Sequence, residues 1–180
     1  GGPVLADCAY GNGREWPAAA QGAGHSLVPL VTADQASGAL DYGGNWRASA
    51  FRGGSPGQPD PAPVRDLVVN EIVAHTDYTN AARPEYDSND WLELFHAGSG
   101  GSVTLTNWYL SDSPTNLMKW ALPPTLQMTP GSWLTFAEVG GFHDPITYGF
   151  GLSKYGETVY LSYLPGTAAD RVAEIGRAHV

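Results

Sequence analysis

Carboxylate side chains gather between Glu71 and Glu93, and they are the groups in this sequence best suited to chemistry. The stretch holds six acids, offset only by Arg83: Glu71, Asp77, Glu85, Asp87, Asp90 and Glu93. Carboxylate oxygens are preferred ligands of Ca²⁺, and long connections such as 75–90 often carry function. We therefore predict a candidate calcium site at Asp77, Glu85, Asp87 and Asp90. The alternative is a solvated acidic loop, because residues 87–90 lack the ligand spacing of an EF-hand.

Two tyrosines, Tyr78 and Tyr86, lie in the same connection, beside these carboxylates. Exposed aromatic rings next to hydrogen-bonding groups are one way to bind a sugar, by stacking and hydrogen bonding. Both tyrosines are therefore candidate ligand-binding residues for a glycan. The alternative is that their rings pack the long loop against the domain.

The patterns expected of an enzyme are weak. Glu71 and Glu93 could form a catalytic carboxylate pair, but a strand glutamate in a sandwich usually faces solvent or pairs with Arg or a backbone N–H. His75 and Asp77 lack the nucleophile of a triad, because no G-x-S-x-G motif occurs. The histidines show no zinc-site spacing. The single cysteine, Cys8, is predicted to be a half-buried apolar residue. We predict no catalytic residue and no cofactor except calcium.

Short apolar runs separated by turn signals would position these groups. We predict strands at 67–74, 91–96, 103–110, 117–121, 133–137, 158–162 and 171–175. Alternation directs Leu92 and Leu94 to one face of their strand, and it directs Val159 and Leu161 inward in theirs. No run has sustained helical periodicity, and residues 143–148 form at most a short helical turn. About seven short strands indicate an all-β domain of the sandwich type.

Charge and composition exclude several classes of protein. The 180 residues carry 18 acids against nine Lys and Arg, for a net charge of −9. Phosphate binding needs a basic surface, so a nucleic-acid partner and an anionic membrane surface are both disfavoured. No apolar run approaches transmembrane length, so membrane insertion is not expected. The first residues do not have the pattern of a signal peptide, so a secreted parent would carry its signal upstream of this sequence.

The composition changes near residue 60. Residues 53–63 hold four Pro and three Gly, which is typical of a linker. We place the linker at 58–63, between a loop-rich N-terminal segment, 1–57, and a β-sandwich domain, 64–180. Within the N-terminal segment, Val4–Tyr10 is predicted as one strand.

Five short sequence motifs follow one another along the larger domain. They are Asn70-Glu71-Ile72, Asp90-Trp91-Leu92-Glu93-Leu94, Trp108-Tyr109-Leu110-Ser111-Asp112, Leu134-Thr135-Phe136 and Gly156-Glu157-Thr158-Val159-Tyr160-Leu161. Together they resemble the lamin tail domain, which implies an immunoglobulin-like β-sandwich of seven to nine strands. Two turn positions depart from the family pattern: His96, where the family often has Asn, and Asn107, where a Gly often precedes the Trp.

The N-terminal segment carries a weaker resemblance. Trp16-Pro17, Ser26-Leu27 and Trp46–Ser49 are similar to the closing stretch of bacterial lamin-tail-like domains. The resemblance implies that residues 1–57 end a preceding copy of the domain.

The resemblance also implies a role. The chain is expected to be a non-catalytic structural or protein-interaction module of a large multidomain bacterial protein that is secreted or at the cell surface. Its expected partners are neighbouring domains of the same protein, other surface proteins, or glycans. The alternative is a calcium- or carbohydrate-binding accessory module of a secreted enzyme.

Overall fold

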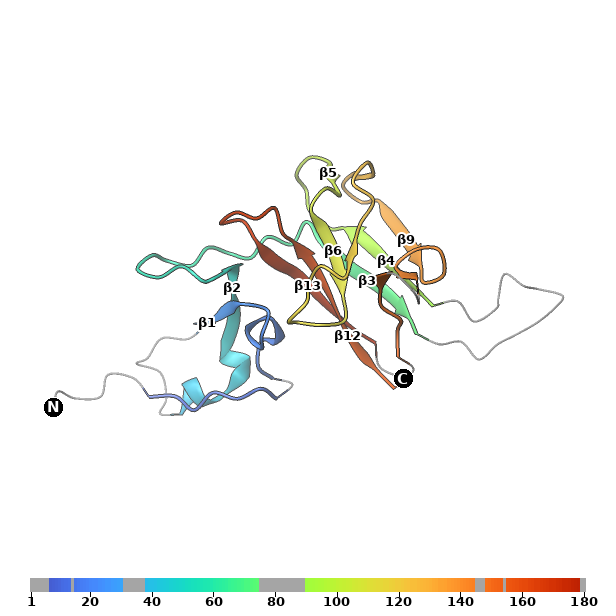
Figure 1. The fold of residues 1–180 in the computed structure, drawn as a ribbon. Helices are drawn as coiled ribbons and strands as arrows, with labels where there is room; N and C mark the ends of the chain where they lie inside the picture. The colour runs from blue at the N-terminus through green and yellow to red at the C-terminus, as the bar shows by residue number, and fades with distance from the viewer. Residues whose placement is uncertain are drawn as a thin grey trace. The chain divides into compact units, whose positions relative to one another are not determined.

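The fold is available as a computed structural model, which describes residues 7–13, 15–30, 38–74, 90–144, 148–153 and 155–178. The chain divides into two compact units, Gly1–Pro63 and Val64–Val180, called unit 1 and unit 2 below (Figure 1). Among the described residues, the helical segments are three single 3₁₀ turns and the named strands pair only antiparallel. The prediction of an all-β chain is therefore confirmed.

Unit 1 is built on one hairpin. Strand β1 (His25–Pro29) pairs with β2 (Trp46–Arg52), with a bulge between His25 and Leu27. Three 3₁₀ turns accompany the hairpin: η1 (Ala18–Ala20), η2 (Ala39–Asp41) and η3 (Gly43–Asn45). The rings of Trp16 and Trp46 stack with their centroids 6.2 Å apart. This pair gives the unit a small apolar centre.

The N-terminal strand prediction fails where it can be checked. Residues 7–10 form no strand, and residues 4–6 lie outside the described residues. Cys8, predicted to be half-buried, is exposed. Cys8 is exposed because residues 7–10 form no strand, so no neighbouring strand covers its side chain.

Unit 2 contains two main sheets. Their orders are β13-β12-β6-β7 and β3-β4-β9, and two further pairs are β5-β8 and β10-β11. The strands are β3 (Leu67–Val73), β4 (Trp91–His96), β5 (Val103–Thr104), β6 (Trp108–Ser111), β7 (Trp120–Ala121), β8 (Gln127–Met128), β9 (Trp133–Ala137), β10 (His143–Asp144), β11 (Tyr148–Gly149), β12 (Glu157–Tyr163) and β13 (Arg171–Ala178).

One apolar core joins the two main sheets of unit 2. Leu92 and Leu94 of β4 belong to the same cluster as Val159 and Leu161 of β12, and all four are fully buried. Burying each such side chain contributes roughly 1.5–3 kcal/mol. The inward orientation predicted for Val159 and Leu161 is confirmed, and the face that Leu92 and Leu94 were predicted to share is the one that faces the core. Both faces of β12 are covered, however, because the intervening Tyr160 is also buried.

Several strand boundaries differ from the prediction. The single strand predicted at 103–110 is two strands, because the chain turns at 105–107 between β5 and β6. There the N–H of Trp108 donates to the Leu105 carbonyl at 3.2 Å. The strand predicted at 117–121 shrinks to β7, and β8 was not predicted. Strands of two residues contain too little alternation to be recognised.

The short helical turn allowed for at 143–148 does not form at its described residues, because 143, 144 and 148 lie in strands β10 and β11. His143 faces Gly149 across the β10–β11 hairpin. Gly149 has a φ of +87°, and a Cβ there would lie 1.9 Å from the Phe142 carbonyl oxygen. The close approach of the two strands therefore requires glycine, which the local sequence pattern does not reveal.

The turn before β6 yields a test. Asn107 has a φ of +64°, in the left-handed region that Gly and Asn tolerate best. Asn107→Gly should leave the free energy of unfolding unchanged or raise it, while Asn107→Ala should lower it by about 1 kcal/mol. Urea unfolding measures both. Asn116→Ala, at a position without positive φ, is the control. An equal loss in the two alanine variants would contradict the argument.

Candidate functional site

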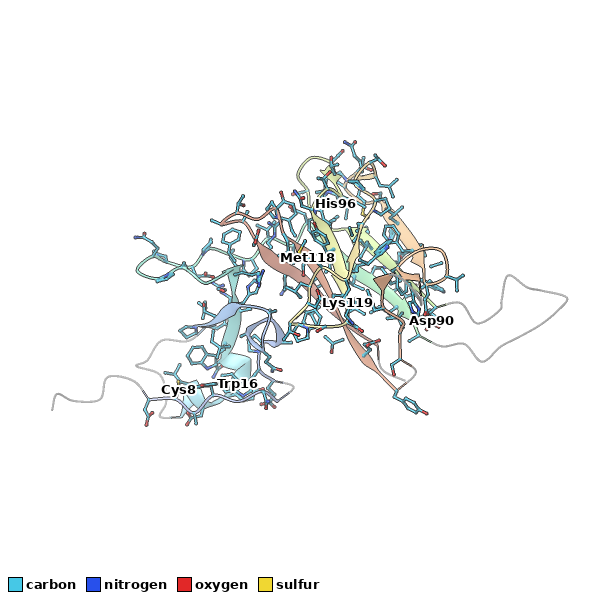
Figure 2. All side chains as sticks on the ribbon, viewed as in Figure 1. Cys8, Trp16, Asp90, His96, Met118 and Lys119 are labelled. Carbon is cyan, nitrogen blue, oxygen red and sulfur yellow. The ribbon has the colours of Figure 1, made fainter. Side chains whose placement is uncertain are left out.

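Most of the predicted site residues cannot be placed. Five lie outside the described residues: Asp77, Tyr78, Glu85, Tyr86 and Asp87. Asp90, labelled in Figure 2, is 7% exposed, and its carbonyl accepts the N–H of Glu138 at 2.7 Å. Its backbone thus joins the start of β4 to the end of β9. Calcium binding and sugar binding by this loop stay predictions.

The described residues contain no group of three or more His, Cys, Asp and Glu side chains that could hold a metal ion. They do contain the predicted Glu71–Glu93 pair, because these two residues face each other between β3 and β4. Glu93 is engaged in hydrogen bonds: Asn70 Nδ2 donates to one carboxylate oxygen at 2.7 Å, and Thr135 Oγ1 lies 3.5 Å from the other.

A second polar group joins β9 to β10. His143 Nδ1 lies 2.5 Å from Glu138 Oε1. Gly151 covers this pair, since a Cβ at Gly151 would lie 2.9 Å from the same Glu138 oxygen. A carboxylate and a histidine in contact can exchange a proton. Here their bond fixes the hairpin to the adjoining strand.

Glu157, at the start of β12, lies in an acidic environment. Burial raises the pKa of Glu157, and the charges of Asp112 and Glu138 raise it further, against the N–H of Ser153 and the charge of Lys119. The Ser153 N–H donates to its carboxylate at 3.0 Å. Asp112 in turn forms an ion pair with Lys119. The first contact lies at the start of β12 and the second within the β6–β7 connection, and the charges of Asp112 and Lys119 act on Glu157 across the space between them.

His96 closes β4 and is 1% exposed (Figure 2). Its Nε2 lies 3.1 Å from the Gly101 carbonyl, which can only accept, so Nε2 carries the proton. Its Nδ1 is buried without a hydrogen-bond partner. This histidine pins the turn that follows β4, a role that the sequence pattern did not reveal.

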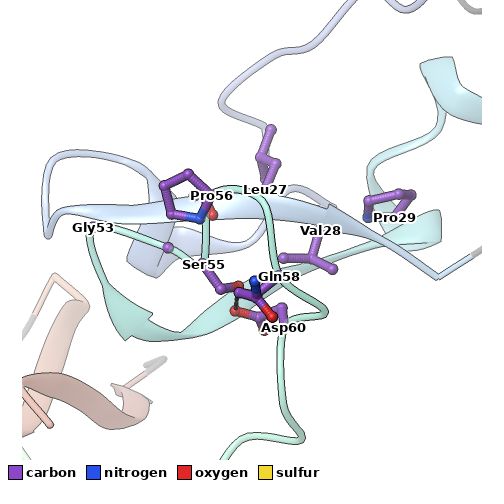
Figure 3. A pocket seen from close by; sticks show the side chains of 10 residues that line it. Leu27, Val28, Pro29, Gly53, Ser55, Pro56, Gln58 and Asp60 are labelled. Atoms are coloured by element: carbon purple, nitrogen blue, oxygen red, sulfur yellow. Dashed lines mark hydrogen bonds between the residues drawn. The ribbon is translucent and has the colours of Figure 1, made fainter. Parts of the chain in front are cut away.

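Unit 1 contains an open groove of about 350 Å³ between β1 and the segment that follows β2 (Figure 3). Its lining residues are Ser26, Leu27, Val28, Pro29, Gly53, Gly54, Ser55, Pro56, Gln58 and Asp60. Glycines allow the close approach on which the groove depends. Gly54 has a φ of +69°, and a Cβ there would lie 2.6 Å from Ser26 Oγ. The N–H of Gly53 donates to the Gly24 carbonyl at 2.8 Å.

One carboxylate holds this segment in place. Asp60 accepts hydrogen bonds from the Arg47 guanidinium, from Ser55 Oγ at 2.8 Å and from the Ala50 N–H at 2.9 Å. Its side chain is only 5% exposed. Burial alone would raise the pKa of Asp60, but the bonds from Arg47, Ser55 and Ala50 outweigh it and lower the pKa. The sequence offered no signal for this network, because its members lie up to 13 residues apart.

His25 is the second buried titratable group of unit 1. Its Nδ1 lies 2.8 Å from the Ser49 carbonyl, and the residue is 7% exposed. Burial lowers the pKa of His25, and the nearby Arg52 lowers it further, although the Ser49 contact acts in the opposite direction. The folded unit therefore favours the neutral imidazole.

Comparison of the chain with protein-family models, curated proteins and solved structures finds no match. The lamin-tail resemblance therefore depends on the sequence motifs alone and stays a prediction. Within the described ranges, no helix is long and apolar enough to cross a membrane.

The two buried groups of unit 1 predict an acid-labile unit. His25 has a lowered pKa, so below about pH 6.5 the unfolded chain takes up a proton first and the free energy of unfolding falls. A second fall should begin below about pH 4, through Asp60. Thermal melts followed by the indole N–H signals of Trp16 and Trp46 would measure both.

Variants separate the two effects. Asp60→Asn should remove the lower fall, whereas Asp170→Asn should not, since Asp170 caps a turn of unit 2. His25→Gln should remove the upper fall. A melting temperature of unit 1 that stays constant between pH 7 and pH 5 would contradict the role of His25.

Ionisation of Glu157 should change the free energy of unfolding with pH in the direction opposite to that of His25 and Asp60. Its raised pKa means that the folded state holds the proton more tightly, so the ionised side chain destabilises unit 2 above about pH 4.5. Glu157→Gln should raise the melting temperature of unit 2 at pH 7. The corresponding gain in the free energy of unfolding should be less than about 1 kcal/mol. Calorimetry should find no gain at pH 3.5 and none for the exposed Glu15→Gln. A gain that persists at pH 3.5 would exclude a charge effect.

Proposed function

We propose that the chain is a non-catalytic structural and protein-interaction module of the lamin tail type, part of a larger secreted or cell-surface protein. The observation that carries this proposal is the groove beside β1. It is an open, partly apolar surface on a small compact unit, adjacent in sequence to the β-rich unit 2. The proposed occupant is an extended segment of a neighbouring domain or of another surface protein.

The hairpin supports this choice of occupant. In the described part of unit 1 the sheet consists of β1 and β2 alone, so each strand has one edge without a strand neighbour. Such edges accept an added strand, whose main chain supplies hydrogen bonds while pockets receive alternate side chains. The apolar side chains of Leu27, Val28 and Pro56 line the groove and suit the second requirement.

The groove is also preorganised. Asp60 holds its far wall through Arg47, Ser55 and the backbone of Ala50. A wall that is ordered before binding does not lose that conformational entropy when the partner arrives. The network therefore favours recognition over a purely passive spacer.

In unit 2, the described polar clusters support a structural role. Glu138, His143 and Glu157 are bound to neighbouring strands and turns. The alternative proposal, a calcium- or carbohydrate-binding accessory module of a secreted enzyme, was based mainly on residues 75–90. No contact in the described residues favours calcium.

A peptide display library tests the interaction proposal. The immobilised 180-residue chain should enrich extended peptides with alternating apolar residues, at micromolar affinity or tighter. Leu27→Lys should weaken the enriched peptides at least tenfold, because Leu27 lines the groove. The matched control is Leu30→Lys, since Leu30 is 59% exposed and lies just outside the groove.

Two outcomes would overturn the proposal. One is the absence of any enriched peptide. The other is peptide binding that Leu27→Lys and Leu30→Lys weaken equally. Tryptophan fluorescence and the melting temperature establish that both variants are folded.

A further inference from the structure

The outer face of the sheet β3-β4-β9 carries an ordered set of aromatic and polar side chains. Since Leu92 and Leu94 point into the core, the alternate residues Trp91, Glu93 and Phe95 point outward. Register extends these positions across the sheet in three rows. The pairs between β4 and β9 are Trp91 with Ala137, Glu93 with Thr135, and Phe95 with Trp133.

The Phe95–Trp133 row forms an aromatic platform. The two ring centroids are 5.0 Å apart and the planes are inclined by 29°, so the rings are stacked. Trp133 is 59% exposed although it lies within a strand of the sheet. A large apolar ring held rigidly in water in this way is suited to contact a ligand.

The neighbouring row is polar and fixed. Glu93 receives the Asn70 amide at 2.7 Å and lies 3.5 Å from Thr135 Oγ1. The bulge between Val69 and Glu71 places an additional residue in β3 at this level. A carboxylate with a set orientation therefore lies next to the aromatic platform.

We propose that this face binds a neutral polysaccharide. A sugar ring would lie on the exposed face of Trp133, and its hydroxyl groups would donate to the Glu93 carboxylate. Trp91 lies four residues from Phe95 along β4, about 14 Å away in an extended strand. The face is therefore long enough for several sugar units in a row.

The negative charge of this face favours a neutral glycan over an anionic glycan or an apolar protein surface. Glu71 and Glu93 are cross-strand neighbours on this face, and the chain has a net charge of −9. An anionic glycan would be repelled. An apolar protein surface would have to remove two carboxylates from water, which is costly. The hydroxyl groups of a neutral sugar can donate hydrogen bonds to these carboxylates in place of water. This inference concerns unit 2 and does not depend on the groove of unit 1.

Affinity electrophoresis of the full chain tests the proposal. Native gels would contain mixed-linkage β-glucan, galactomannan or xyloglucan, or alginate as the anionic comparison. At least one neutral polymer should retard the chain, and alginate should not. Trp133→Ala should raise the dissociation constant at least tenfold, and Glu93→Gln by a smaller factor. Tyr155→Ala is the control, because Tyr155 is exposed by 87% in another part of unit 2.

Three outcomes would overturn the proposal. They are the absence of retardation by any neutral polymer, equal retardation of the wild type and a folded Trp133→Ala variant, and retardation by alginate alone. Sedimentation analysis adds a fourth. If the chain self-associates and Trp133→Ala alone abolishes the association, the face binds a second copy and not a glycan. Melting temperatures within a few degrees of the wild type would verify that the variants are folded.

Discussion

The period of two along a β-strand is the constraint on which the main features of unit 2 depend. Burial of Leu92 and Leu94 against the core forces Glu93 and Phe95 to the opposite face of β4. A slip of one residue would expose the leucines and bury the carboxylate, so the register is strongly specified. The same energetic term that stabilises the sandwich therefore orients the proposed binding face.

Unit 1 depends on polar contacts for its stability more than unit 2 does. Its apolar centre is small, and Asp60 connects the segment that follows β2 to β2 itself through the Arg47 guanidinium and the Ala50 N–H, while it also binds the Ser55 hydroxyl of its own segment. Hydrogen bonds to a charged group are stronger than neutral ones, but leaving such a group unpaired is costly. A unit held in this way depends on a few polar groups, and its order is sensitive to their protonation. The same hydrogen bonds of Asp60 hold the groove in shape and make that shape sensitive to pH.

Several polar side chains that are buried or partly buried in unit 2 fix connections between strands. His96 holds the turn after β4, and the Glu138–His143 contact holds the β10 hairpin. At the start of β13, the Arg171 guanidinium lies 4.7 Å from the Tyr163 ring centroid and 5.7 Å from that of Trp108. Burial lowers the pKa of Arg171, against the attraction of Asp66. These polar groups contact other parts of unit 2. The proposed partner contacts are therefore made by the groove of unit 1 and by the outer face of the sheet β3-β4-β9.

The sequence by itself determined the all-β class, which residues of β4 share a face, the inward side of β12, and the turn position at Asn107. Each of these depends on alternation or on turn chemistry within a few residues. Tertiary structure alone decided the division of 103–110 into two strands, the hairpin at β10–β11, and the contact of Arg47 with Asp60. It also brought Phe95 beside Trp133, 38 residues further along the chain. Register between distant strands is set by the whole core, and no local pattern encodes it. The sequence predicts sugar-binding aromatics at Tyr78 and Tyr86, which lie outside the described residues, whereas the pairing of Phe95 with Trp133 on β4 and β9 became visible only in the structure.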